Sequence, residues 1–588
     1  MIGYAPFHQP HDFLMSRISQ RSLPSRWRLP GIHPVLQRVY AARGVTSAAD
    51  LELSLQSLLP YQSMKGIGQA VELLLPVVTE GRRLLIVGDF DVDGASSTAL
   101  AIRALRMLGA RHVDYLVPNR FDFGYGLSAE LVQVALTMAP DLIMTVDNGI
   151  ASHEGILAAR AEGVPVLVTD HHLPGDTLPA AAAIVNPNQP GCAFPSKAAC
   201  GCTVVFYLML ALRARLNELR LLPEPAPNMA SLLDLVALAT VADVVPLDHN
   251  NRILVEQGLR RIRAGFACAG ILALLQVAGR ESARTVASDF GFAVGPRLNA
   301  AGRLDDMSLG IECLLTDDAL RALNLAQTLD EMNRDRRSIE QGMQAEAMHY
   351  LDRFDDSAAL PVGLCLYQPD WHQGVIGILA SRIKDKVHRP VIALAADADG
   401  WLKGSARSVP GLHMRDALDE VHKRAPGLMK KFGGHAMAAG LTLAATGLEE
   451  FSRLFDDVCR AHLSAAQLQQ QLETDGPLET SEFSLELAQL LRWGGPWGQA
   501  FPEPLFSGEF RLQQQRVVGE RHLKMVLQPA GSDMVLDAIW FNIDSACWPD
   551  HNADVVSCVF QLDVNEFRGR QSVQLLVKDL TPEPLYNG

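Results

Sequence analysis

Apolar residues occur in short runs that alternate with longer amphipathic segments from about residue 80 onward. The runs are rich in Val, Ile and Leu, and the segments between them are long enough to hold crossover helices. This alternation is typical of a parallel sheet covered by helices, so we predict an α/β fold. The predicted strands are Leu84–Val87, Val113–Val117, Leu142–Val146, Val166–Val168 and Ala183–Val185.

The pattern changes on both sides of this predicted sheet. Apolar residues at helical spacing precede it, and residues 316–355, which contain no proline, predict a long connecting helix. A second α/β unit follows, and alternating runs such as HLKMVLQ and QSVQLLVKDL then indicate a small antiparallel barrel of the OB type. The predicted domains are a helical N-terminal extension (1–75), a parallel-sheet domain (76–315), the connecting helix (316–355), a second α/β domain (356–465) and the barrel (470–588).

The longest apolar runs fall well short of the roughly 18 residues that a transmembrane helix needs. The N-terminus has Pro, His and Asp where a secretory signal has a continuous apolar segment. We therefore expect a cytoplasmic protein that is not bound to a membrane. The nine cysteines lack the spacing of a disulfide framework, so we expect reduced thiols.

Composition narrows the choice of partners. Hydrophobic residues make up 48% of the chain and charged residues 20%, which argues against a disordered or fibrous protein. The 52 Lys and Arg residues are outnumbered by 66 Asp and Glu residues, and the formal net charge of −14 argues against a general coating for duplex DNA. Any contact with nucleic acid must therefore be local.

Acidic side chains and imidazoles follow three of the predicted strands. Because ligands of an open parallel sheet gather at the carboxyl ends of its strands, these side chains are candidates for one site. A further carboxylate, Asp243, lies in the apolar segment LATVADVVPL, where it needs a partner if it is buried. The residues at the strand ends are Asp89, Asp91 and Asp93 in GDFDVDG, Asp147 in VDNG, and Asp170, His171 and His172 in TDHH.

Clustered carboxylates repel one another unless a cation lies between them, and hard divalent cations bind carboxylate oxygens. For GDFDVDG alone, a solvated turn or a helix cap is an equally good interpretation. The additional strand ends favour a metal site. Carboxylate and imidazole ligands without thiolates suit Mn²⁺ or Mg²⁺, and there are enough carboxylates for two ions that share a ligand.

These motifs resemble the DHH phosphoesterase superfamily, whose name-giving triplet matches Asp170-His171-His172, and within it the RecJ single-strand exonucleases. The resemblance extends from about residue 45 to the C-terminus and includes GPRLNAAGRL, WHQGVIG, KGSARS and GGHAMAAG. It implies that the predicted parallel-sheet domain is a DHH domain, that the second α/β domain is a DHH-associated domain, and that the barrel is an OB fold.

The resemblance also implies how the ligands divide between two metal ions. Asp91 and Asp147 hold one ion, and Asp147 bridges to the second. Asp89 is either a ligand or a support for one. His172 is expected to donate a hydrogen bond to a phosphoryl oxygen in the transition state, or to support its neighbours. The ligands of the second ion are Asp93, Asp147, His171 and Asp243.

Residues outside the metal cluster indicate the substrate. Ser405 and Arg407 of KGSARS suit a phosphate, because the guanidinium fork and the small-residue backbone can approach its oxygens. The resemblance identifies this place as a pocket for a 5′-terminal phosphate, assisted by Arg297 or by Arg303. A surface ion pair is the alternative for Arg407, and His435 could simply cap a turn. The other predicted substrate contacts are Arg120, Tyr125, Gly434 and His435.

The resulting prediction is a metal-dependent 5′-3′ exonuclease that releases 5′-mononucleotides from single-stranded DNA in recombination and mismatch repair. The resemblance further implies cooperation with a single-strand-binding protein and a DNA helicase. One alternative is a DHH phosphoesterase that acts on short oligonucleotides or nucleotide phosphates. The other is a non-catalytic replication scaffold that binds single strands, which is disfavoured because no expected metal ligand is missing.

Overall fold

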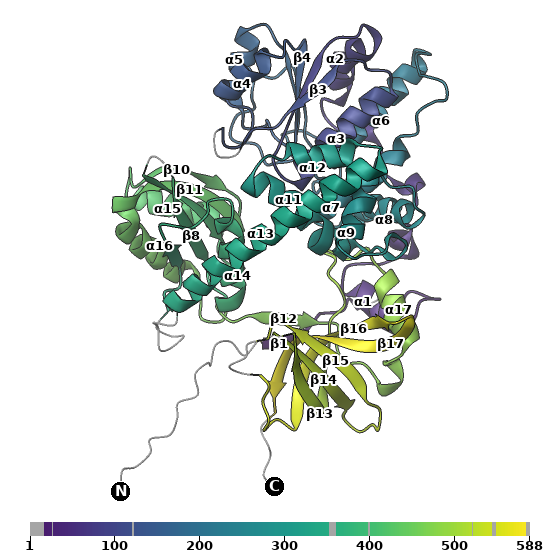
Figure 1. The fold of residues 1–588 in the computed structure, drawn as a ribbon, viewed down its shortest axis with the longest axis vertical. Coiled ribbons are helices and arrows are strands. Elements are labelled where there is room, and N and C mark those ends of the chain that lie inside the picture. Colours follow the sequence, from purple (N-terminus) through teal and green to yellow (C-terminus); the bar gives the residue numbers. More distant parts are fainter. Residues whose placement is uncertain are drawn as a thin grey trace. The chain divides into compact units, whose positions relative to one another are not determined.

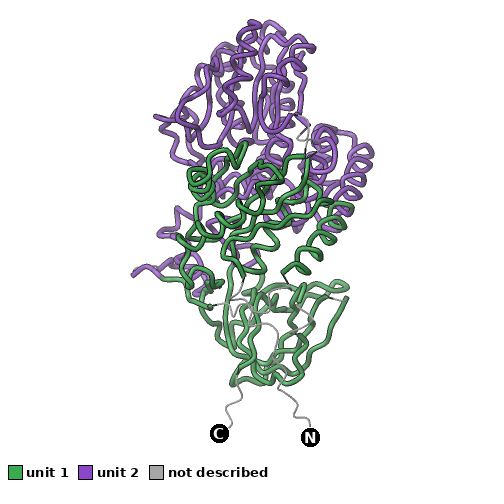
Figure 2. Tube along the Cα trace, turned by 90° about the vertical axis from the view of Figure 1, so that its left-hand side faces the viewer, with its two compact units in different colours: residues 1–22, 335–489, 504–588 green, residues 23–334, 490–503 purple. Residues whose placement is uncertain are grey.

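The computed structural model describes residues 17–25, 28–119, 123–351, 360–397, 400–519, 521–543 and 548–583. The chain divides into two compact units, which Figure 2 distinguishes by colour. Unit 1 comprises residues 1–22, 335–489 and 504–588, and unit 2 comprises residues 23–334 and 490–503. Within the described ranges, no helix has the length and apolar character that a bilayer crossing requires.

Unit 2 contains a five-stranded parallel sheet (Figure 1). Its strand order is β3-β2-β4-β5-β6, so the chain places β3 on one side of β2 and β4 on the other. This reversal beside β2 is the place where open α/β sheets bind ligands. The predicted parallel sheet is confirmed. The strands are β2 (Leu84–Gly88), β3 (Val113–Leu116), β4 (Leu142–Val146), β5 (Val166–Thr169) and β6 (Ala183–Val185).

Helices cover the sheet because alternate side chains of each strand point to opposite faces and every residue of β2, β4 and β5 is buried. On one face, Leu131 of α4 and Ile156 of α5 pack against Val87 and Ile143. The helices of unit 2 are α1 (Pro34–Ala41), α2 (Ile67–Thr79), α3 (Val92–Met107), α4 (Ala129–Leu136), α5 (His153–Ala161), α6 (Gly201–Glu218), α7 (Leu233–Ala242), α8 (His249–Arg263), α9 (Ala269–Val277), α10 (Ala287–Asp289), α11 (Gly295–Leu304) and α12 (Ser308–Leu315).

Helix α13 (Ala319–Leu351) contributes to both units and lies within the predicted connecting helix, whose last residues, 352–355, fall outside the described residues. Beyond it, unit 1 contains a mixed sheet with the order β10-β11-β9-β8-β7, in which only the β7–β8 pair is parallel. The strands and helices of this α/β part are β7 (Leu364–Tyr367), β8 (Val391–Ala396), β9 (Trp401–Arg407), β10 (Met429–Gly434), β11 (Ala438–Ala444), α14 (Ile376–Val387), α15 (Met414–Arg424) and α16 (Leu448–His462).

The C-terminal strands of unit 1 close into a barrel in the order β13-β14-β15-β17-β16, which confirms the predicted OB-type domain. The barrel is not wholly antiparallel as predicted, because β15 and β17 pair in parallel. Along β14 the burial alternates at every residue, as expected for a strand with one face in a barrel core. The barrel strands and the helix that precedes them are β13 (Phe506–Val518), β14 (His522–Pro529), β15 (Leu536–Phe541), β16 (Val555–Phe567), β17 (Arg570–Pro582) and α17 (Leu485–Trp493).

Strand β1 (Arg17–Gln20) corrects the helical interpretation of the N-terminal extension. It pairs in parallel with β12 (Gln471–Thr474), with Arg17 opposite Gln471. Four residues are too few to show a period of their own, and the backbone of β12 imposes the extended conformation. Residues 1–16 lie outside the described residues, and helices α1 and α2 belong to unit 2 rather than to the unit of β1.

The segment 490–503 returns from unit 1 to unit 2 shortly before the barrel begins. There the rings of Trp497 and Phe501 stack on Tyr40 of α1, whose hydroxyl donates a hydrogen bond to the carbonyl of Gly494 at 2.8 Å. The guanidinium of Arg252 lies 4.4 Å from the centre of the Phe501 ring, a cation–π contact. Residues distant in sequence therefore complete the core of unit 2.

Candidate metal centre

The GDFDVDG loop connects β2 directly to α3, and helix capping fixes the carboxylate of Asp91. Asp91 is the N-cap residue of α3, and its Oδ1 accepts a hydrogen bond from the backbone nitrogen of Gly94 at 3.0 Å. The sequence left capping and metal binding as alternatives. They are compatible here, because a cap occupies one carboxylate oxygen and leaves lone pairs on the other.

Asp93, in the first turn of α3, is anchored by the start of α6. Its side chain is 1% exposed, and its two oxygens accept hydrogen bonds from the backbone nitrogens of Gly201 at 2.6 Å and Cys202 at 2.8 Å. The amino end of a helix favours negative charge, so this contact stabilises the carboxylate in the buried site.

Asp147 ends β4 in a left-handed backbone conformation, with φ at 61°, which is uncommon and strained for a residue other than glycine. Gly201 lies directly against it: a β-carbon on Gly201 would be 2.7 Å from the β-carbon of Asp147 and 2.8 Å from its Oδ1. Gly201 was not among the residues predicted for the site. The available signal was a glycine at the start of an otherwise apolar helix, which marks close packing.

Replacing Gly201 with alanine is expected to displace Asp147 and to weaken metal binding, because the added methyl group overlaps the carboxylate. Isothermal titration with Mn²⁺ should show an affinity at least about tenfold lower, the size of effect that disturbing a ligand's support produces. Gly175→Ala is a matched control, because a β-carbon there has no atom within 4 Å among the described residues. Unchanged Mn²⁺ affinity for the Gly201 variant would show that the carboxylate can move without cost.

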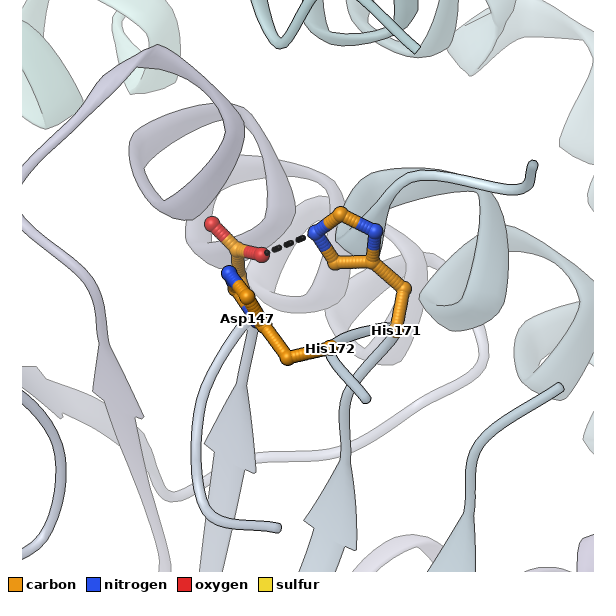
Figure 3. A group of neighbouring side chains, drawn as sticks. All are labelled: Asp147, His171 and His172. Carbon is orange, nitrogen blue, oxygen red and sulfur yellow. Dashed lines mark ion pairs between the residues drawn. The ribbon is translucent and has the colours of Figure 1, made fainter. Parts of the chain in front are cut away.

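His171 lies at the centre of the carboxylates. Its Nε2 is 3.1 Å from Asp147 Oδ1, 3.5 Å from Asp243 Oδ2 and 3.7 Å from Asp93 Oδ2. Figure 3 shows the carboxylate of Asp147 facing the ring of His171, each at the end of its strand. Among the described residues, three groups have candidate ligand atoms within 4.8 Å of one another. They are Asp89, Asp91 and Asp147; Asp93, His171 and Asp243; and Asp147, His171 and His172.

The buried and mutually repelling carboxylates of this cluster favour the binding of cations. Burial, followed by the negative charge of Asp93, raises the pKa of Asp91 and raises the pKa of Asp147 and of Asp243 well above the usual value. Asp147 Oδ1 and Asp243 Oδ2 are buried and accept no hydrogen bond from the described residues. Oxygens that lack donors and an imidazole nitrogen form a donor set that suits Mn²⁺ or Mg²⁺, so the residues fit divalent cations.

His172 points its Nδ1 at Asp170 Oδ1, 2.8 Å away, and Asp170 is also held by the backbone nitrogen of Ile150 at 2.9 Å. Burial lowers the pKa of His172, but the hydrogen bond and charge of Asp170 outweigh it and raise the pKa to about 9. A carboxylate only accepts hydrogen bonds, so Nδ1 carries a proton. Asp170 therefore orients the ring of His172. This orientation is compatible with both expected roles of His172, which are donation of a hydrogen bond to a phosphoryl oxygen and support of its neighbours.

Tyr125 was predicted to contact the substrate, and the structure also gives its hydroxyl two contacts within the site. That hydroxyl donates a hydrogen bond to the carbonyl of Asp147 at 3.0 Å and lies 3.1 Å from His172 Nδ1. The residue is nevertheless 50% exposed. Tyr125 therefore supports the strained backbone of Asp147 while part of its ring remains accessible. Arg120, predicted beside it, lies outside the described residues.

Arg297 and Arg303 lie in different surroundings on α11. Arg297 is 9% exposed, and its guanidinium contacts Asp330 Oδ1 through Nε at 2.8 Å and the carbonyl of Ala293 through Nη1 at 2.6 Å. Arg303 follows Gly302, whose β-carbon would be 1.9 Å from the carbonyl oxygen of Phe90. Gly302 therefore packs α11 closely on the GDFDVDG loop, and Arg303, which is half-buried, is the next residue of the helix.

Ser405 and Arg407 lie together on β9 in unit 1. The Arg407 guanidinium contacts Ser405 Oγ at 3.1 Å, Ser381 Oγ at 3.2 Å and the carbonyl of Ala406 at 2.8 Å. None of these groups is charged, and Arg407 forms no ion pair within the described part of the chain; burial lowers its pKa. A largely buried cation without a counter-ion is costly and provides a site for an anion.

Gly434 and His435 shape the turn beside this arginine. Gly434 has φ at 140°, and a β-carbon there would be 2.5 Å from the carbonyl oxygen of Ala438, so the fold itself requires glycine. The backbone nitrogen of His435 donates to that same carbonyl at 2.7 Å and closes the β10–β11 turn. Ala438 pairs with Arg407 across the sheet, which places this turn at the Arg407 end of β9.

Comparisons with known proteins identify three matching families along the chain. The DHH family, N-terminal domain, matches residues 83–240, the DHHA1 domain matches residues 360–461, and the RecJ OB domain matches residues 474–579. All three agree with the fold described above.

Whole-chain relatives are also present. The single-stranded-DNA-specific exonuclease RecJ of Dickeya dadantii is 57% identical over 552 residues, which cover 93% of this chain and 96% of the relative. The exonuclease of the same name from Escherichia coli is 54% identical and covers 96% and 99% of the two chains. A crystal structure of RecJ from Thermus thermophilus in complex with Mn²⁺ matches with a TM-score of 0.80 at 30% identity, covering 98% of this chain and 80% of that one.

Proposed function

The chain belongs to the RecJ family of single-stranded-DNA-specific exonucleases, and on this premise we propose that it removes 5′-mononucleotides from the 5′ end of single-stranded DNA by hydrolysis of the phosphodiester bond. It is a metal-dependent exonuclease, and its residues fit Mn²⁺ or Mg²⁺. The polarity, the mononucleotide product and the roles of individual residues are the proposed part.

The observation that carries the chemical proposal is the convergence of Asp93, Asp147 and Asp243 within 3.7 Å of His171 Nε2. Asp91 and Asp147, with Asp89 close by, would hold one ion. Asp147 would be shared with the second, whose other ligands are Asp93, His171 and Asp243. When bound, two such ions supply Lewis-acid stabilisation of phosphoryl charge and lower the pKa of water.

The surrounding residues position the substrate and the ligands. His172, protonated and oriented by Asp170, would donate a hydrogen bond from Nε2 to a phosphoryl oxygen. Tyr125 would keep Asp147 in its strained conformation and offer its exposed ring face to a base. Asp89, 5% exposed, would act as a ligand or as a support for Asp91.

End recognition is proposed for Ser405 and Arg407, because a guanidinium without a charged partner can bind the two negative charges of a terminal phosphate. Gly434 and His435 would border that phosphate. Of the two arginines on α11, we assign Arg303 to the substrate, because the guanidinium of Arg297 is committed to Asp330.

The order of product release tests the proposal. With Mn²⁺ present, a strand labelled at its 5′ end should release labelled mononucleotide at the earliest times, whereas a 3′-labelled strand should shorten progressively before its label appears as mononucleotide. EDTA should abolish both signals. Early mononucleotide from the 3′ label would refute the polarity, and much faster cleavage of dinucleotides than of long strands would favour the alternative of a small-substrate phosphoesterase.

The family relationship also supports a proposal for where the protein acts and in which processes. We infer that the protein acts in the cytoplasm, in recombination and mismatch repair, on strands that a DNA helicase exposes and a single-strand-binding protein coats. A non-catalytic scaffold is disfavoured because all five predicted metal ligands are present at one place, and turnover in the labelling experiment would exclude it.

A further inference from the structure

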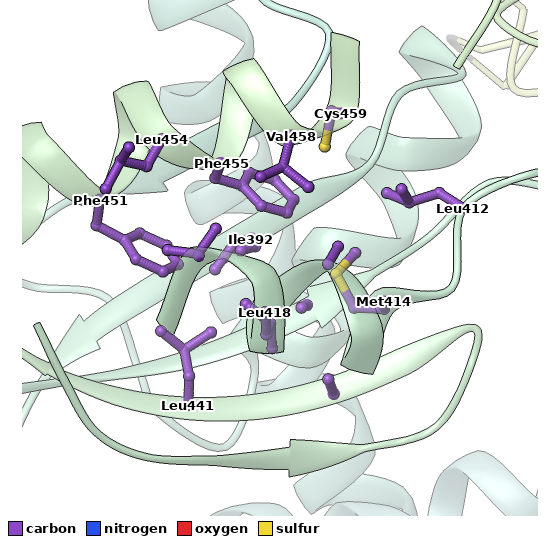
Figure 4. Close-up of a cluster of buried hydrophobic side chains, with 14 of the residues drawn as sticks. Ile392, Leu412, Met414, Leu418, Leu441, Phe451, Leu454, Phe455, Val458 and Cys459 are labelled. Atoms are coloured by element: carbon purple, nitrogen blue, oxygen red, sulfur yellow. The ribbon is translucent and has the colours of Figure 1, made fainter. Parts of the chain in front are cut away.

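The face of the sheet that carries Arg407 extends along β9 beyond Ser405. Alternate residues of a strand share a face, so Lys403 lies on the same face as Ser405 and Arg407. The opposite face is core, where Ile392 and Leu441 meet side chains of α15 and α16 (Figure 4). On the Arg407 face, α14 packs over β8 and β9, with Gly377 and Ser381 against Ser405 and Arg407, so the part to be considered for binding is the remaining face of β9, β11 and β10.

The strand register arranges this face in rows. In the first row, Lys403 of β9 is opposite Thr442 of β11, which is opposite Lys431 of β10. Like-facing residues on one strand are about 6.7 Å apart, so the lysine row is one short step from the row of Ser405. That second row consists of Ser405, Gly440 and Gly433.

A β-bulge adds to the positive charge at the β10 edge. The register shifts between Met429 and Lys431, and the extra residue is Lys430. Met429 remains buried in the core, whereas the ammonium of Lys430 lies 4.6 Å from the centre of the Trp401 ring. Trp401 belongs to the same face of β9 as Lys403, so the bulge turns Lys430 as well as Lys431 away from the core.

These lysines have few charged partners. The ammonium of Lys403 lies 3.8 Å from Asp397 and 3.5 Å from Thr442 Oγ1, and Lys431 forms no ion pair with any described residue. A lysine on an edge strand can have no role other than to discourage pairing with other chains, which would explain Lys430 and Lys431 without a ligand. That explanation does not cover Lys403, which lies two strands inside the β10 edge.

The two glycines between the lysine row and Arg407 are not required by the fold. A β-carbon at Gly440 would have a single neighbour within 4 Å, the carbonyl oxygen of Gly404 at 3.9 Å, and one at Gly433 would have none among the described residues. Neither glycine adopts positive φ. Glycine weakens a strand, and its presence without a packing reason marks a place where a ligand approaches the backbone closely.

We propose that Lys403 and Lys431, with Gly433 and Gly440 as the floor between the lysine row and Arg407, bind a second phosphate group of the substrate strand, next to the one bound at Arg407. The inference rests on the proposed function, since it extends the terminal-phosphate pocket. The second phosphate comes either from the first internucleotide linkage or from a 5′-triphosphate end, and both sources present the same chemistry to the lysines.

The test is binding of a 3′-fluorescent, 5′-phosphorylated oligonucleotide to the full-length protein in EDTA, measured by anisotropy between 50 and 200 mM KCl. For the Lys403→Gln/Lys431→Gln variant, the dissociation constant should rise about tenfold at the lowest salt. The slope of log K against log salt should become less steep by about 0.7, the value for loss of one single-strand phosphate contact. Lys423→Gln is the matched control, because Lys423 lies on α15, which packs on the opposite face of the sheet.

Two modified strands separate the sources of the phosphate. If a neutral methylphosphonate at the first linkage removes the difference between wild type and the double variant, the site binds the internucleotide phosphate. If a 5′-triphosphate enlarges that difference, the site binds the terminal phosphates. An equal difference on every strand would show a general charge effect and refute the subsite.

Gly440→Ala provides a test that does not change charge. The fold has room for the methyl group, so the melting temperature should not fall, while the dissociation constant should rise because the floor is filled. A double lysine variant with the slope of the Lys423 control, together with unchanged binding of the Gly440 variant, would overturn the inference. If wild-type protein released no nucleotide from a 5′-phosphorylated strand with Mn²⁺, the proposed function itself would fail.

Discussion

Replacing Asp147 with asparagine is expected to reduce the cleavage of single-stranded DNA by on the order of 10³-fold or more, which corresponds to about 4 kcal/mol of transition-state stabilisation. Asp147 belongs to two of the three ligand groups, so one substitution is expected to disturb the binding of both proposed ions. Initial rates on a 5′-phosphorylated strand with saturating Mn²⁺ would measure the effect. Asp114→Asn, on the exposed side of β3, should retain full activity.

The same variant has an expected stability signature that separates metal binding from a purely structural role. The pKa of Asp147 is raised in the folded protein, so without metal its carboxylate costs stability increasingly as the pH rises above the ordinary value of about 3.9. In EDTA at pH 8 the asparagine variant should therefore melt at a higher temperature than wild type, and this difference should vanish near pH 4. Added Mn²⁺ should stabilise wild type much more than the variant. A lower melting temperature for the variant in EDTA at pH 8 would mean that the carboxylate supports the fold.

Arg407→Ala is expected to lower kcat/KM for a 5′-phosphorylated strand about 10- to 100-fold, the range for loss of charged hydrogen bonds. A strand with a 5′-hydroxyl group should be affected little, because it offers no terminal charge to the guanidinium. Competition between the two strands in one reaction would measure the loss of end selection directly.

Arg453→Ala removes a guanidinium from α16. Among the described residues this guanidinium pairs only with the exposed carboxylate of Asp457, at 3.5 Å, so the variant should leave the selection intact. Equal losses on the phosphorylated and hydroxyl strands would show that Arg407 supports the sheet or the chemical step rather than the end of the substrate.

The parallel sheet could be predicted because its central strands are buried on both faces and therefore appear as continuous apolar runs. The polar residues that follow those runs could be identified as candidate ligands, because the carboxyl ends of parallel strands meet at one edge of the sheet. Both inferences need only local patterns and the geometry of a parallel sheet.

Other parts of the site depend on contacts between distant segments. The hydrogen bonds from the start of α6 to Asp93 join residues 108 and 109 positions apart, and no local pattern reports them. Gly201 and the second role of Tyr125 were missed for this reason. The choice between Arg297 and Arg303 likewise depended on Asp330, a partner on another helix.

The return of residues 490–503 to unit 2 means that the order of the chain and the order of its folding do not coincide. A protein emerges from the ribosome N-terminus first, and unit 2 lacks Trp497 and Phe501 until most of unit 1 has been synthesised. Until then the aromatic surface around Tyr40 stays exposed on the nascent chain. Completion of the half of the molecule that holds the metal ligands is thereby coupled to synthesis of nearly the whole polypeptide.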